Sequence, residues 1–158
     1  MFDTIAGLPL HPLVVHAVIV LVPLAALGAL VVSVRPTWDR TYGWLVVLTA
    51  LVATGSSVVA KLSGEQLASR VGFPADHEQI ATLMPLFSGL LLIAVSALWW
   101  WDRKGEQTPD RMRTVLAVLT TLTAVFALIW AIRAGHSGAT AVWKPIVDST
   151  TPGSLPVG

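Results

Sequence analysis

Four long apolar stretches, separated by short polar segments, dominate the chain. They cover about residues 12–34, 43–60, 79–101 and 114–134, and Asp, Glu, Lys and Arg occur only at or near their ends. Each approaches the ~20 residues that an α-helix needs to cross ~30 Å of hydrocarbon. The pattern therefore predicts an all-α fold, an integral membrane bundle of four helices in contact with the lipid bilayer.

The composition agrees with a membrane protein and excludes several functions. Of the 158 residues, 54% are hydrophobic and 12% are charged, and a soluble domain normally carries about twice that share of charge. The absence of cysteine excludes disulfides, thiolate metal sites and a cysteine nucleophile. With a net charge of +1 the chain has no basic stripe, so we expect no nucleic-acid partner.

The basic residues predict the orientation in the membrane. Arg35 and Arg40 lie in the first connection, and the third connection, WDRKGEQTPDRMR, holds four more basic residues. The positive-inside rule places both connections in the cytoplasm and both termini outside. Because Asp3 precedes the first apolar stretch and no Lys or Arg does, we interpret that stretch as a retained helix and not as a signal peptide. We expect a multi-pass protein of the bacterial inner membrane.

We expect one transmembrane domain at residues 1–145, built from two helical hairpins without a further repeat, and a flexible extracytoplasmic tail at 146–158. Gly135 is placed to end the fourth helix as a C-cap. Pro23 and Pro85 fall inside apolar stretches, where proline kinks a helix.

All four histidines fall at the predicted extracytoplasmic end. His11 and His16 begin the first helix, His77 begins the third, and His136 follows the fourth. Positions five apart in a helix differ by about 140° in direction, so His11 and His16 are poorly placed to chelate one metal ion. His16 is the deepest of the four, and we expect it to face the bundle interior because a polar ring facing lipid is costly.

Imidazoles in this position are typical ligands of haem b, which needs one or two axial histidines from facing helices. His16 is the best candidate ligand, with His77 or His136 opposite, while Arg133 lies at the right level for a propionate. A zinc or copper site could instead use three or four of the same histidines with Asp76 or Glu78. Alternatively, the imidazoles bind only backbone carbonyls, water or headgroups.

Four motifs occur in a fixed order along the chain: LPLHPLVVH, TG near the end of the second helix, HE at the start of the third, and GHSGATAVW after the fourth. With these motifs, over roughly residues 8–145, the sequence resembles the bacterial membrane protein family catalogued as domain of unknown function 2231. The resemblance implies a four-helix protein with a cytochrome b-like histidine pattern, some of whose relatives occur beside redox domains. It makes His11, His16, His77 and His136 the candidate functional positions.

The sequence thus predicts a small b-type cytochrome that exchanges electrons with a quinol or an extracytoplasmic redox protein, an electron carrier more than a stand-alone enzyme. One alternative is a membrane protein that binds a transition metal through histidines. Another is a cofactor-free accessory or scaffold subunit of a membrane complex or homo-oligomer, held by small-residue helix faces.

Overall fold

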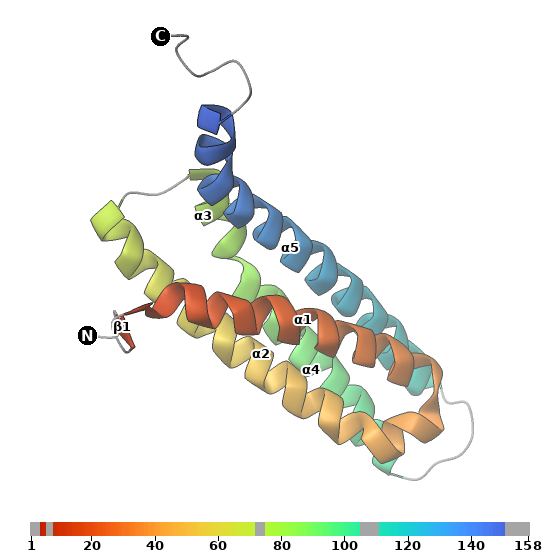
Figure 1. Cartoon of the computed structure of the whole chain (residues 1–158). Coiled ribbons are helices and arrows are strands. Elements are labelled where there is room, and N and C mark those ends of the chain that lie inside the picture. Colours follow the sequence, from red (N-terminus) through yellow and green to blue (C-terminus); the bar gives the residue numbers. More distant parts are fainter. Residues whose placement is uncertain (1–3, 6–7, 72–74, 105–110, 151–158) are drawn as a thin grey trace, which may run out of the picture.

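The computed structural model of the chain describes residues 4–5, 8–71, 75–104 and 111–150 (Figure 1). A two-residue hairpin comes first, in which strand β1 (Thr4–Ile5) pairs antiparallel with β2 (Leu8–Pro9). The helices that follow are α1 (Leu10–Val34), α2 (Pro36–Val71), α3 (Ala75–Ala81), α4 (Met84–Arg103) and α5 (Arg111–Thr150). The predicted all-α fold is confirmed apart from the short hairpin.

The four long helices form an elongated bundle (Figure 1). Helix α1 packs against α2 and α5, and α4 packs against the same two, so that α1 and α4 occupy opposite corners. We call the end that holds His11 and His77 the histidine end. The opposite end, where α1 joins α2 at Arg35, is called the turn end.

Small residues fill the centre of the bundle. Ala25 and Ala29 of α1 are almost completely buried, as are Ala53 of α2 and Ala127 of α5, whereas α4 contributes larger residues such as Leu91. Small side chains let neighbouring helix backbones approach closely, which is how helices associate in a membrane. The outward surfaces carry exposed Leu, Ile, Val and Trp side chains, and α1, α2, α4 with its preceding turn, and α5 are each long and apolar enough to cross a bilayer.

Several helix ends differ from the predicted positions. Helix α5 continues through Gly135 to Thr150, so Gly135 does not act as the expected C-cap. Tertiary contacts made by the residues beyond Gly135 outweigh its weak local preference to end a helix. The kink expected at Pro85 is instead a break between α3 and α4, because proline has no N–H to donate and its ring clashes with a carbonyl one turn earlier.

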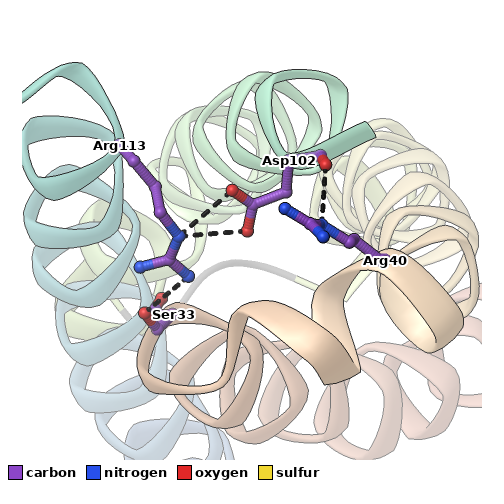
Figure 2. A network of polar contacts seen from close by, with 4 residues as sticks. All are labelled: Ser33, Arg40, Asp102 and Arg113. Carbon is purple, nitrogen blue, oxygen red and sulfur yellow. Dashed lines mark hydrogen bonds and ion pairs between the residues drawn. The ribbon is translucent and has the colours of Figure 1, made fainter. Parts of the chain in front are cut away.

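A buried ion pair joins the helices at the turn end (Figure 2). The Arg113 Nε of α5 donates to both carboxylate oxygens of Asp102 of α4, at 3.1 and 3.2 Å. A second nitrogen of Arg113 donates to the Ser33 carbonyl of α1 at 3.2 Å, and the Arg40 Nε of α2 donates to the Asp102 carbonyl at 3.0 Å. The network therefore ties together all four long helices.

Candidate functional site

His11 lies in the first turn of α1 and packs against the C-terminal half of α2. Its Nδ1 lies 2.9 Å from the Ala60 carbonyl oxygen and 3.4 Å from the Ser63 hydroxyl. The ring rests against Gly64, where an added Cβ would stand only 2.9 Å from His11 Cε1. A side chain larger than hydrogen at position 64 would therefore displace the imidazole.

His77 has the same kind of environment on the other side of the bundle. It lies in α3, and its Nδ1 is 3.0 Å from the hydroxyl of Ser137 in α5. Its ring rests against Gly138, where a Cβ would stand 3.1 Å from His77 Cε1. Each imidazole is thus held by a Ser-Gly pair of the neighbouring helix.

The hydrogen bonds determine the tautomer of both rings. The Ala60 carbonyl can only accept, so the Nδ1 of His11 must donate to it. The Ser137 hydroxyl donates to the Ala134 carbonyl at 3.0 Å and therefore accepts from the Nδ1 of His77. In the neutral form of each ring, Nε2 then keeps its lone pair, which a metal-ligating imidazole needs.

Electrostatics favours the neutral form of His77. Burial lowers the pKa of His77 below its ordinary value of 6.5, and a charge on His11 lowers it further. We call His11 and His77, with the Ser-Gly pairs that hold them, the imidazole pair.

The two environments resemble each other because a similar pattern of residues recurs in the two halves of the chain. The segment Ala60–Gly64 reads AKLSG and the segment 134–138 reads AGHSG. The shift in residue number that leads from His11 to His77 also leads from buried positions of α1 to buried positions of α4. These pairs are Val18 and Met84, Val22 and Ser88, Ala25 and Leu91, Ala29 and Val95, and Val32 and Leu98. The offset between the two Ser-Gly pairs likewise relates Ala50, Ala53 and Ser57 of α2 to Ala124, Ala127 and Ala131 of α5.

We expected no repeat beyond two helical hairpins, and these recurring positions relate one hairpin to the other. Both halves begin at the histidine end, and α1 and α4 lie at opposite corners between α2 and α5. The two hairpins therefore run in the same direction along the bundle. The recurring A-x-x-S-G sequence was the signal that could have revealed this relation between the hairpins.

The other candidate residues lie apart from the imidazole pair. His16 is exposed on the outside of α1, and its Nδ1 bonds to the Pro12 carbonyl of its own helix, so the expectation that it faces the interior is wrong. The five-residue spacing directs His11 and His16 to different faces, and the inner one belongs to His11. His136 is also exposed, and the exposed Arg133 stacks its guanidinium over Trp130 at 5.0 Å.

Among the described residues no group of three or more His, Asp and Glu side chains could hold a metal ion. The side chains of Asp76 and Glu78 lie outside the described residues. What the described part of the chain offers at this end is a pair of imidazole donors.

The fold and the apolar helices define a multi-pass membrane protein of four long helices. The family model described as "predicted membrane protein", domain of unknown function 2231, matches residues 7–151, and the chain belongs to that family. The family resemblance seen in the sequence motifs is thereby confirmed. Comparisons with curated proteins and with solved structures find no match.

Proposed function

We propose that this protein is a small b-type cytochrome of the bacterial cell membrane, whose haem iron is ligated by His11 and His77. The observation that carries the proposal is the imidazole pair: both rings donate Nδ1–H to fixed acceptors of the protein. Each Nε2 lone pair remains for a metal, and the corresponding positions in the two halves supply the two axial ligands that a low-spin haem takes.

The surroundings of the imidazole pair suit this role. The hydrogen bonds to Ala60 and Ser137 fix the orientation of the rings and raise their basicity as ligands. Arg133 lies one helical turn before Ser137 on α5 and provides a cation for a propionate. When bound, haem supplies one-electron exchange. Since all four histidines lie toward one end, the proposed partner is a quinol or redox protein at that face.

A haem fits the donors better than zinc does. Zinc sites in proteins use three or four protein ligands, whereas the imidazole pair provides two and the described residues offer no larger group. A copper or zinc ion held additionally by Asp76 or Glu78 is the alternative. The remaining alternative is an accessory subunit without cofactor, in which the two rings only join the helices.

The test is a dithionite-reduced minus oxidised absorption spectrum of the full-length protein, purified in detergent from haem-replete cells. A Soret band with sharp α and β bands is expected for the natural sequence. His11→Ala and His77→Ala should each remove these bands, while the matched variants His16→Ala and His136→Ala should keep them. A flat spectrum of the natural protein would contradict the proposal, and elemental analysis would then separate a metal site from a cofactor-free subunit.

A further inference from the structure

A second group of ionisable side chains lies at the turn end, far along the bundle from the imidazole pair. Asp39, in the first turn of α2, has no exposed surface. Among the described residues neither of its carboxyl oxygens has a hydrogen-bond partner. An ionised carboxylate that is buried without a donor loses its hydration with no compensation, which is strongly unfavourable.

The charged groups that act on Asp39 are Asp102 and Arg113. Arg113 already directs its Nε to both oxygens of Asp102 and a further nitrogen to Ser33 (Figure 2). Arg40, beside Asp39 on α2, directs its Nε to the backbone of Asp102. The carboxyl groups of Asp39 and Asp102 therefore both interact electrostatically with the Arg113 guanidinium. The side-chain hydrogen bonds from Arg113 go to Asp102 and not to Asp39.

Gly43, one turn after Asp39, gives the carboxyl group its space. A Cβ at position 43 would collide with Asp39 Oδ1 and with the Trp99 ring of α4. The Nε1 of Trp99 is also buried without a partner among the described residues, while Arg103 covers the ring face at 4.9 Å. The Asp39 carboxyl group and the Trp99 ring, both with unpaired polar atoms, thus lie over the same glycine. Asp39 is therefore not held in an ion pair.

We propose that Asp39 and Asp102 form a proton-binding acid pair, in which Asp39 carries the proton and Asp102 carries the charge that pairs with Arg113. With one proton, Asp39, Asp102 and Arg113 together carry no net charge, while the exposed Arg40 carries its charge in contact with solvent. Like charges in close proximity cannot both ionise, so the proton goes to the carboxyl group that lacks donors. Loss of this proton would place a second negative charge in the network that joins the four helices. This inference is independent of the proposed haem.

The test is infrared spectroscopy of the full-length protein at neutral pH, where a protonated carboxyl shows a C=O stretch that carboxylates lack. A band is expected in the natural protein, and Asp39→Asn, which is neutral and nearly isosteric, should remove it. The control Asp148→Asn changes an exposed aspartate bonded to Lys144 at 2.8 Å and should leave the band intact.

A third variant tests the coupling between the two acids. In Asp102→Asn the carboxylate that is bonded to Arg113 is gone, so Asp39 should ionise, and the band should disappear although Asp39 is still present. Circular dichroism confirms that each variant keeps its helices. No band in the natural protein, or a band that survives Asp39→Asn, would overturn the proposal.

Discussion

The glycines that face His11 and His77 show how single atoms position the imidazole pair. In a helix, glycine is ordinarily less favourable than alanine by about 1 kcal/mol. At Gly64 and Gly138, however, a Cβ would come within 2.9 and 3.1 Å of an imidazole ring. At Gly55 and Gly135 a Cβ meets nothing within 4 Å. The same substitution should therefore have opposite effects at the two kinds of position.

We predict that Gly135→Ala raises the thermal stability of the detergent-solubilised protein, by up to about 1 kcal/mol. Gly64→Ala should lower it or leave it unchanged, because the displacement of His11 offsets the gain in helix propensity. Thermal unfolding followed by circular dichroism measures both. Equal stabilisation by the two substitutions would show that the His11 ring does not need the space over Gly64.

The lowered pKa of His77 makes stability depend on pH. The unfolded chain takes up a proton at this position as the pH falls through 6.5, whereas the folded chain resists it. Stability decreases on acidification wherever the unfolded state binds more protons than the folded state. His77 therefore stabilises the fold above pH 6.5, and this contribution is lost as the pH falls below that value.

We therefore expect the melting temperature of haem-free protein to fall on acidification, and to fall less in His77→Gln. The exposed His136→Gln serves as the matched control and should follow the natural protein. A pH dependence that His77→Gln does not reduce would contradict the assignment.

Sequence reasoning was partly successful at the residue scale. It predicted that His11 and His16 point in different directions, because the angle between positions five apart follows from helix geometry alone. It could not predict which of the two faces inward, since α1 is apolar nearly all round and its sequence marks no inner face. The inner face is determined by contacts with Ala60, Ser63 and Gly64, which lie about fifty positions later in the chain.

At the scale of elements, the ion pair between α4 and α5 should contribute more to stability than any surface pair. The side chains of Asp102 and Arg113 are 4% and 18% exposed. The Lys144–Asp148 pair, within α5, has exposures of 66% and 61% and a shorter contact of 2.8 Å. Burial, and not distance, should decide the effect of removing one partner.

We predict that Asp102→Ala destabilises the protein by about 3 kcal/mol, because Arg113 loses both of its hydrogen bonds to Asp102 and Asp39 makes none to it. Asp148→Ala should change stability by no more than about 0.5 kcal/mol. Thermal or denaturant unfolding of both variants in the same detergent gives the comparison. Similar effects of the two substitutions would mean that water reaches Arg113 and replaces the lost acid.

The number and approximate positions of the long helices were predictable because apolar length alone identifies membrane spans. Their ends were not, and Gly135 shows why. Its sequence neighbourhood resembles a C-cap, yet the next turn of helix is needed to bring Ser137 and Gly138 to the His77 ring. Tertiary contacts of this kind leave no local signal.

At the scale of the whole molecule, the recurring pattern in the two halves gives the two ends different properties. At the histidine end each half supplies a histidine and an A-x-x-S-G segment, and the result is a pair of imidazoles in similar surroundings. At the turn end the offset that relates Ser63 to Ser137 relates Asp39 to Arg113. Corresponding positions there carry opposite charges, so the two halves are joined by an asymmetric electrostatic network.

The basic residues near the turn end predict how these two ends are oriented in the membrane, and this prediction can be tested in a chain without cysteine. Thr140 and Thr37 are matched probes, because both are exposed and neutral and lie toward opposite ends of the bundle. We predict that a membrane-impermeant maleimide labels Thr140→Cys in intact cells, and labels Thr37→Cys only after the membrane is permeabilised. The opposite result would place the imidazole pair on the cytoplasmic side. A quinol or protein partner would then have to approach from the cytoplasm, although the geometry of the two rings would be unchanged.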